Sequence, residues 1–382
     1  MDARSDRSGT HTDLLFDARH VQQSGIGTYI RTELPHLEDA FARHGLSLAV
    51  LVDEANRPTL RETTKVVVSD PPAAPMYSRQ EQKAWGRALR EVRPRAMWLP
   101  HYPFPFPLLL PRNRRTKYFV TVHDTLHIRE QSITGQNAAF RAYARTMLTV
   151  DGRRATRIFT PSHTTAAALT DAVPSARVTV TPLPVEDLWF TAADTARSPV
   201  DGRYLLYVGN TKWHKNLPVL IDAFGQVAQS LPHKLVIAGG GESVKNFDER
   251  IGVLAEQAQN VEIVGRIDFD ALRALVARAD LLVMPSLYEG VGLPPLEAMA
   301  SRTAVLASDI PALRETCGEG AEYFDPHDAG ALAGLIRTYC TDDAARAALA
   351  ERGWAHVTER QARISRSTAA AETVCAELQV AS

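Results

Sequence analysis

The stretch LLVMPSLYEGVGLPPLEAMA, residues 281–300, decides the fold of this chain. Residues 281–284 are a short apolar run of the kind that a parallel strand buried on both faces shows. Gly290 and Gly292 favour a sharp turn that leaves backbone N–H groups uncovered. The prolines at 294–295 fit the first turn of a helix, where no N–H group is missed. The uncovered amides and the positive end of the helix together predict a binding site for an anion.

Two carboxylates flank the predicted anion site, Glu289 on the loop and Glu297 in the first turn of the helix. Taken alone, Glu297 would complement the helix dipole and Glu289 would be a solvated loop residue. Together they suit a diphosphate with hydroxyl groups on both sides, as in a sugar nucleotide with its sugar and its ribose. We therefore interpret this stretch as a sugar-nucleotide site.

The segment YEGVGLPPLEAMA, residues 288–300, resembles without gaps the E-x7-E motif of retaining GT-B glycosyltransferases. The resemblance is strongest to glycosyltransferase family 4, in a mannosyltransferase-like form, and extends roughly over residues 13–375. It implies an α/β chain with the GT-B fold, in which two Rossmann-like, doubly wound domains face each other across a cleft. It also implies transfer with retention at the anomeric carbon, with no metal and no cofactor, because the nucleotide sugar is a substrate.

The domain layout expected from this resemblance has four parts. They are a disordered N-terminus at 1–12, an acceptor-binding domain at 13–195, a nucleotide-sugar domain at 196–360, and a C-terminal helix at 361–382 that returns to the first domain.

Length and composition agree with two domains of a globular protein. The chain has 382 residues, too many for one ordinary core. Its net charge of -1 gives no reason to expect a nucleic-acid partner. Three scattered cysteines without a C-x-x-C pair argue for a reducing compartment and against a disulfide framework or a cysteine zinc site. No apolar signal core or membrane-length run is present, so we expect a cytoplasmic protein.

Strand-like and helical patterns alternate along both halves, which favours doubly wound α/β domains. The first half has strand-like runs at 13–17, 46–52, 65–68, 96–99, 118–122, 157–161 and 178–181. The second half has them at 203–209, 234–238, 261–264, 281–284 and 304–307.

Gly25 and Gly27 follow the first predicted strand and precede a helical pattern. The third glycine of a dinucleotide fingerprint is missing, since Ile30 stands in its place. The pair fits either a tight turn or a loop where a ligand approaches the backbone. Family 4 enzymes have a similar loop on the acceptor and phosphate side of the cleft, which favours the second interpretation.

His123 stands at the end of the strand in FVTVHDTLH, residues 119–127. Ligands bind at this end of the strands in open α/β sheets. The segment is similar to the T-x-H-D segment of the family, which implies that His123 lies beside the donor sugar. His127 has no such support.

Lys215 lies between a predicted strand and a predicted helix in VGNTKWHKNLP, residues 208–218. Lysines are usually just solvated, but the K-N-L match implies that Lys215 pairs with the donor diphosphate. Gly209 ends the strand, and Asn210 stands where many family members have an arginine, which puts the usual arginine–phosphate contact in doubt.

The donor site implied by the resemblance has two further parts. Backbone near Gly265 and Arg266 would meet the nucleotide base, and the amides of Gly290, Val291, Gly292 and Leu293 would meet the phosphates. A separate D-x-D, Asp268–Asp270, precedes an amphipathic helix and is interpreted as a helix cap rather than a metal site.

The loop HYPFPFPLLLPRNRR, residues 101–115, combines apolar residues and prolines with three arginines. Prolines exclude a regular helix or a central strand here. The loop either packs over the sheet edge or docks on a lipid surface, so peripheral membrane contact stays open.

The predicted reaction transfers a hexose from a GDP- or UDP-linked donor to a hydroxyl of a glycan, lipid-linked or small-molecule acceptor. The segments at 208–218 and 288–300 suggest mannose. Lys215 would stabilise the leaving phosphate, Glu289 would hold sugar hydroxyls, and His123 would lie near sugar and acceptor. Glu297 would hold the ribose. Two alternatives are a GT-B sugar-nucleotide epimerase and a non-catalytic nucleotide-sugar-binding protein, while the incomplete fingerprint disfavours a dinucleotide oxidoreductase.

Overall fold

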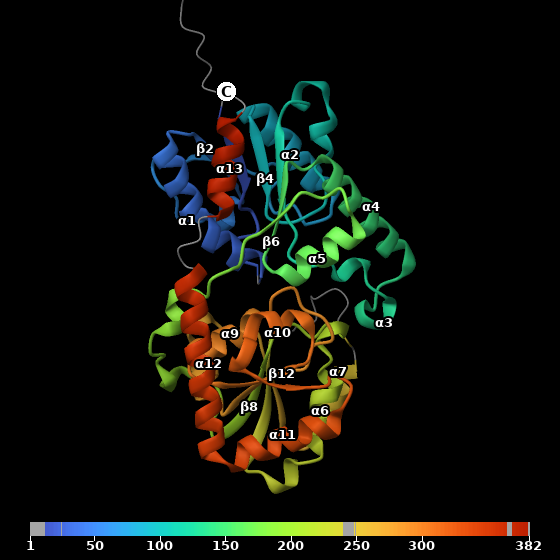
Figure 1. Cartoon of the computed structure of the whole chain (residues 1–382), viewed down its shortest axis with the longest axis vertical. Helices are drawn as coiled ribbons and strands as arrows, with labels where there is room; N and C mark the ends of the chain where they lie inside the picture. Colours follow the sequence, from blue (N-terminus) through green and yellow to red (C-terminus); the bar gives the residue numbers. More distant parts are fainter. Residues whose placement is uncertain (1–11, 24, 240–247, 249, 365–368, 381–382) are drawn as a thin grey trace, which may run out of the picture.

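The computed structural model describes residues 12–23, 25–239, 248, 250–364 and 369–380. Except for residue 12, the segment expected to be disordered lies outside the described residues. The chain forms two lobes arranged along the long axis of the molecule, each built around one parallel sheet (Figure 1). This confirms the predicted pair of Rossmann-like domains.

The N-terminal sheet has seven strands in the order β3-β2-β1-β4-β5-β6-β7, and its neighbouring strands pair in parallel. The order reverses between β1 and β4, which is where ligands bind in open sheets. The strands are β1 (Leu14–Asp17), β2 (Leu48–Val52), β3 (Lys65–Val68), β4 (Ala96–Leu99), β5 (Lys117–Thr121), β6 (Arg157–Thr160) and β7 (Val178–Val180). The helices are α1 (Ile26–His44), α2 (Arg79–Val92), α3 (Gln131–Thr134), α4 (Ala138–Arg154) and α5 (His163–Ala172).

The C-terminal sheet has six strands in the order β10-β9-β8-β11-β12-β13, also paired in parallel. Its order reverses between β8 and β11. The strands are β8 (Arg203–Val208), β9 (His233–Ala238), β10 (Val261–Gly265), β11 (Leu281–Met284), β12 (Ala304–Ser308) and β13 (Glu322–Phe324). The helices are α6 (Leu217–Gly225), α7 (Arg250–Gln257), α8 (Phe269–Arg278), α9 (Leu293–Ala300), α10 (Pro311–Cys317), α11 (Ala329–Thr341) and α12 (Asp343–Ile364).

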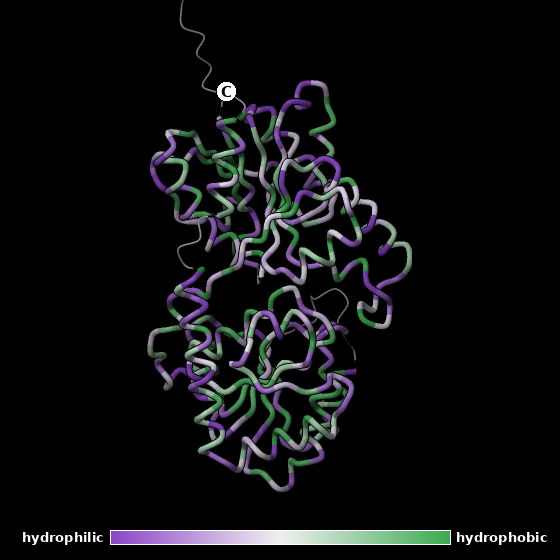
Figure 2. The backbone as a smooth tube through the Cα atoms, in the orientation of Figure 1, coloured by the Kyte–Doolittle hydropathy of each residue, from purple (hydrophilic) through white to green (hydrophobic). Residues whose placement is uncertain are grey.

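The central strands are mainly apolar because helices cover both faces of each sheet. Every residue of β1, β2, β4, β11 and β12 is buried. The hydrophobic segments gather in the middle of each lobe (Figure 2). The predicted strands are confirmed to within one or two residues at their ends. The short edge strand β13 was not predicted.

The last helix, α13 (Ala369–Gln379), packs against α1 of the N-terminal domain, whereas α12 belongs to the C-terminal lobe (Figure 1). Ala371 and Val374 of α13 are buried in the N-terminal core. Arg43 of α1 donates to Glu372 at 2.6 Å. The chain therefore crosses between the domains a second time near its end.

Direct hydrogen bonds join the two domains. Ser162 Oγ donates to the carbonyl of Gly290 at 2.7 Å, and Trp213 Nε1 donates to the carbonyl of Ser132 at 2.8 Å. The Glu315 carboxylate accepts from the backbone N–H of His163 at 2.6 Å, in the first turn of α5. The first of these contacts holds the loop after β11 against the N-terminal domain, and the other two hold the segment after β8 and α10 against it.

Across the described part of the chain, no helix combines the length and the apolar composition that a bilayer crossing requires.

Candidate active site

The glycine loop connects β11 to α9 as predicted, and each glycine is needed for a different reason. Gly292 caps α9 with a φ of 83°, in the left-handed region that favours glycine. Gly290 packs against the other domain, where a Cβ would lie 2.3 Å from the carbonyl oxygen of His123. Pro294 and Pro295 lie in the first turn, as expected. The loop that leads into α9 therefore lies directly against the His123 segment.

Lys215 and Glu289 form an ion pair. Lys215 Nζ lies 2.7 Å from Glu289 Oε1, which also accepts from Ser286 Oγ at 2.6 Å. The side chains are 12% and 10% exposed. The sequence assigned Lys215 to a phosphate and Glu289 to sugar hydroxyls but did not predict this pairing. The pair fixes both side chains beside the helix N-terminus and leaves them at the surface of the site.

Two further basic residues of this segment, His214 and Lys212, differ in burial. His214 is buried, and this burial, with Lys215 and Lys212 as further causes, lowers its pKa to about 2. Its carbonyl accepts from the backbone N–H of Leu287 at 2.8 Å, so it holds the loop. Burial also lowers the pKa of Lys212, while Asp124 of the N-terminal domain opposes the shift. Lys212 therefore faces the other domain.

His123 is held in one orientation and in its neutral form. Its Nε2–H donates to the carbonyl of Pro100 at 2.8 Å, which leaves Nδ1 as the acceptor of the ring. Burial lowers the pKa of His123. Tyr29, from α1, packs edge-on against the ring with centroids 5.0 Å apart. The imidazole can accept a hydrogen bond or a proton from a ligand hydroxyl.

Glu297 is the fifth residue of α9 rather than part of its first turn, because the helix starts at Leu293. Its position in the first turn was therefore wrongly predicted. Burial raises the pKa of Glu297 to about 8, Glu186 adds to the rise, and Arg31 opposes it. Arg31 Nε lies 3.0 Å from Glu186 Oε1. Arg31 and Glu186 were missed by the sequence analysis, although Arg31 follows the glycine pair by about one helical turn.

The glycine pair at the start of α1 forms a close-packed turn. Gly25 caps the helix with a φ of 72°, and a Cβ on Gly27 would lie 2.4 Å from the carbonyl oxygen of Val21. Ile26 and Leu293 both pack against the same N-terminal core cluster. The first turns of α1 and α9 therefore lie on the same side of the N-terminal core.

The remaining donor-site candidates lie at the carboxyl ends of three neighbouring strands. Gly209 and Asn210 follow β8, and Gly265 ends β10, with exposed Arg266 after it. Gly239, at the end of β9 between them, packs so closely that a Cβ would lie 2.4 Å from the carbonyl oxygen of Gly209. The sheet brings these positions onto the same edge as the glycine loop.

The predicted helix cap is also confirmed, since Asp268 Oδ1 accepts from the N–H of Ala271 at 2.8 Å. Asp270 is exposed and pairs with Arg197. Neither aspartate lies among the donor-site residues.

The comparisons with known proteins agree with this layout. Residues 24–187 match the family described as Glycosyltransferase Family 4, and residues 192–355 match Glycosyl transferases group 1. The chain is 30% identical over 224 residues to the O-antigen chain mannosyltransferase RfbU of Salmonella typhimurium, covering 56% of this chain and 62% of that protein. It is 31% identical over 159 residues to O-antigen chain mannosyltransferase B of Escherichia coli, covering 40% of each. The chain thus spans less than two thirds of the length of these curated relatives.

Solved structures share the architecture. The sucrose-phosphate synthase of Thermosynechococcus elongatus superposes with a TM-score of 0.76 at 20% identity, covering 97% of this chain and 100% of that one. WaaG, a glycosyltransferase involved in lipopolysaccharide biosynthesis, gives a TM-score of 0.70 at 14% identity, covering 94% and 99%. Two family descriptions matched in succession from residue 24 to residue 355, on a GT-B fold, show that the chain belongs to the glycosyltransferases of family 4 type.

Proposed function

We propose that the protein transfers a hexose from a nucleoside-diphosphate sugar to an acceptor hydroxyl, with retention at the anomeric carbon. The observation that carries the proposal is the set of groups around one loop. A helix N-terminus, Lys215 and two carboxylates surround the loop after β11, and His123 of the other domain lies directly against it.

Each group has a role in the departure of the nucleoside diphosphate. Lys215 and the amides of the glycine loop stabilise the charge that grows on the leaving phosphate. Glu289 holds hydroxyls of the sugar, and Glu297 those of the ribose. Neutral His123 accepts a hydrogen bond from the sugar or the acceptor through Nδ1. The leaving phosphate helps to deprotonate the acceptor on the same face of the sugar, so no carboxylate has to act as a nucleophile. No metal has a role in this mechanism.

The proposed sugar is mannose and the proposed base guanine. Relatives named mannosyltransferases support the sugar. The base rests on the segments at 208–218 and 288–300, and uracil is the competing choice, because structural neighbours were solved with UDP and UDP-glucose. Gly265 and Arg266, at the end of β10, would meet the base.

The test is incubation of the full chain with GDP- and UDP-linked hexoses and a panel of hydroxyl acceptors, with release of free nucleoside diphosphate as the readout. GDP release from GDP-mannose that requires an acceptor is expected. An isomerised nucleotide sugar without GDP release would indicate the epimerase, and saturable binding without any product would indicate the non-catalytic alternative.

We also propose that the acceptor is presented at a membrane surface. The 101–115 loop packs Phe104 and Leu108 into the N-terminal core, in agreement with the packed-loop alternative. Yet Phe106, Leu109 and Leu110 are 45%, 51% and 41% exposed. Exposed arginines follow them at positions 112, 114 and 115. An apolar tip next to basic residues suits an anionic lipid surface.

Co-sedimentation with vesicles tests this contact. The wild type should bind anionic phosphatidylglycerol vesicles more than phosphatidylcholine vesicles, and the Phe106→Ser/Leu109→Ser variant should bind neither. Leu188→Ser is the matched control, because Leu188 is equally exposed, at 54%, outside this loop. Equal losses in both variants would remove the 101–115 loop from the proposal.

The cellular site proposed is the cytoplasm. Cys317, Cys340 and Cys375 are free and buried, which suits a reducing compartment. A fractionation experiment that finds the protein outside the cytoplasm would overturn this.

A further inference from the structure

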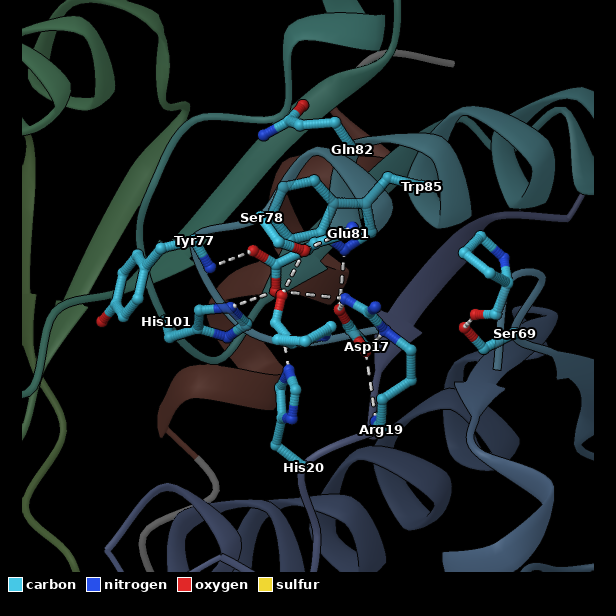
Figure 3. Close-up of polar contacts among 12 residues, drawn as sticks. Asp17, Arg19, His20, Ser69, Tyr77, Ser78, Glu81, Gln82, Trp85 and His101 are labelled. Carbon is cyan, nitrogen blue, oxygen red and sulfur yellow. Dashed lines mark hydrogen bonds and ion pairs between the residues drawn. The ribbon is translucent and has the colours of Figure 1, made fainter. Parts of the chain in front are cut away.

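Three buried side chains converge in the N-terminal domain, apart from the residues of the proposed donor site. His20 follows β1, Glu81 lies in the first turn of α2, and His101 follows β4. Their exposures are 7%, 0% and 2%. Figure 3 shows both histidines and Arg19 arranged around the Glu81 carboxylate. The sheet thus brings together residues that are distant in sequence.

The two imidazoles point at the same oxygen. His101 Nε2 lies 2.9 Å from Glu81 Oε1, and His20 Nε2 lies 3.5 Å from it. His20 Nε2 is buried and has no hydrogen-bond partner. One ligand atom from each residue lies within 4.8 Å of the other two. Two imidazole nitrogens and one carboxylate oxygen are a common ligand set for zinc.

Glu81 directs Oε1 at the two histidines, and Arg19 Nη2 lies 3.4 Å from the same oxygen. Its other oxygen, Oε2, accepts from the backbone N–H of Tyr77 at 2.8 Å. Ser78 Oγ accepts from the N–H of Glu81 at 3.1 Å, which fixes the start of α2. The carboxylate is therefore held from the side opposite the histidines.

The surrounding acidic groups favour a divalent cation. Arg19 binds Asp17 through two hydrogen bonds, at 2.9 and 2.6 Å, and lies 3.4 Å from Glu81. Asp53 also interacts electrostatically with Arg19 and is buried. Three carboxyl groups thus interact with one guanidinium, so acidic groups outnumber the arginine beside the two histidines. Burying such an excess is costly unless it is balanced.

We propose that His20, Glu81 and His101 bind one divalent transition-metal ion, with Zn²⁺ preferred. Imidazole and carboxylate ligands suit zinc among the common divalent ions. The side-chain amide of Gln23 lies 3.1 Å from His20 Nδ1 and orients that ring from behind. The ion ties the segment after β1 to α2 and to the segment after β4. It stabilises the N-terminal domain and takes no part in binding the nucleotide.

The experiment measures zinc directly on tag-free full-length protein. After loading with Zn²⁺ and removal of excess, elemental analysis should find about one zinc per chain, and Co²⁺ should give visible absorption bands in the same site. Zinc should also raise Tm by several degrees, because it binds only the folded form. His20→Gln and His101→Gln should each lose the bound zinc and the rise in Tm.

His163→Gln is the matched control, since His163 is an exposed histidine of the same domain. The His163→Gln variant should keep both the bound zinc and the rise in Tm. Circular dichroism checks that the variants are folded, and having two separate histidine variants keeps the test valid if one of them fails to fold. Wild type without stoichiometric zinc, or zinc loss of the same size in the control, would overturn the proposal. The alternative, a hydrogen-bonded cluster with one protonated histidine, would then remain.

Discussion

The carboxyl edges of the two sheets have the same place in their domains and each has an ion pair, but the two pairs differ in burial. In the C-terminal domain, Lys215 and Glu289 are 12% and 10% exposed at the cleft side of the loop. In the N-terminal domain, Arg19 and Asp17 are 2% and 0% exposed, and several hydrogen bonds hold them. We infer that the first set is available to a ligand, whereas the second set stabilises its own domain. Substitutions should therefore affect chemistry at one edge and stability at the other.

The largest effect is expected for Asp17→Ala. It leaves the Arg19 guanidinium buried without its main partner, and it removes the acceptor of the Trp85 indole N–H. Breaking a buried ion pair costs about 3–5 kcal/mol. Urea unfolding should show this loss of stability. A change below ~1 kcal/mol would mean that water reaches Arg19, and the comparison of the two edges would fail.

Lys215→Ala should lower the rate of transfer by roughly 10²-fold or more, the scale for losing one charge-stabilising donor. Its stability should change little in comparison, because Glu289 keeps the hydrogen bond from Ser286 Oγ. Steady-state kinetics and urea unfolding on the same preparation give both numbers. A near-normal kcat/KM would remove Lys215 from the site.

The two glutamates should separate binding from turnover. Glu297→Gln should weaken binding of the free nucleoside diphosphate by about 1.5–3 kcal/mol, the scale of a charged hydrogen bond. The loss should be larger at pH 9 than at pH 7, because Glu297 has a pKa of about 8 and is ionised only at the higher pH. Calorimetry with the nucleoside diphosphate alone measures this loss of affinity at each pH.

Glu289→Gln is the matched comparison, and it should leave that binding nearly unchanged while lowering turnover, because a mispositioned sugar loses its alignment with the acceptor. Equal effects of both changes on both measurements would mean that the glutamates only support the loop. The reverse pattern would mean that the donor lies the other way round.

The smallest effect expected is a pH dependence of stability. The pKa of Glu297 is raised to about 8 in the folded protein, from an ordinary value of 4.5, so between these values the folded form binds more protons than the unfolded form. Stability should therefore fall as the pH rises from 6.5 to 8. Glu33, with a pKa raised to about 7, and Asp151, raised to about 8, act in the same direction.

Glu297→Gln removes its own part of this dependence and leaves the other groups in place. Unfolding midpoints at pH 6.5 and 8.5 should therefore differ less in the variant than in the wild type. Buried histidines with lowered pKa values also make stability depend on pH, but at lower pH, where the unfolded chain takes up protons that the folded chain does not. The pH range compared therefore starts at 6.5. An identical pH dependence in both proteins would contradict the raised pKa of Glu297.

The sequence allowed the central strands to be predicted because apolar runs such as residues 281–284 need cover on both faces. Gly290 and Gly292 were predictable for a similar reason, since the backbone there tolerates no Cβ without displacing Leu313 or the His123 carbonyl. The edge strand β13 escaped prediction because it is short and begins with a glutamate, a residue depleted in strands, whereas the equally short β7 is β-branched throughout.

The partners within the site could not be read from the sequence. The ion pair between Lys215 and Glu289 and the contact of Gly290 with His123 depend on how distant loops meet. The cluster of His20, Glu81 and His101 has no spacing motif, since the three residues meet only through the strand order of the sheet. The start of α9 at Leu293, earlier than expected, depended on the left-handed conformation of Gly292.

The most direct test of retaining transfer uses proton NMR. It follows the reaction of the full chain with an acceptor and with the nucleotide sugar that binds the protein most tightly. Free nucleoside diphosphate should appear together with a new glycoside, whose anomeric configuration is that of the donor. An inverted configuration would contradict retention. An isomerised nucleotide sugar, or bound donor that is never consumed, would contradict transfer itself.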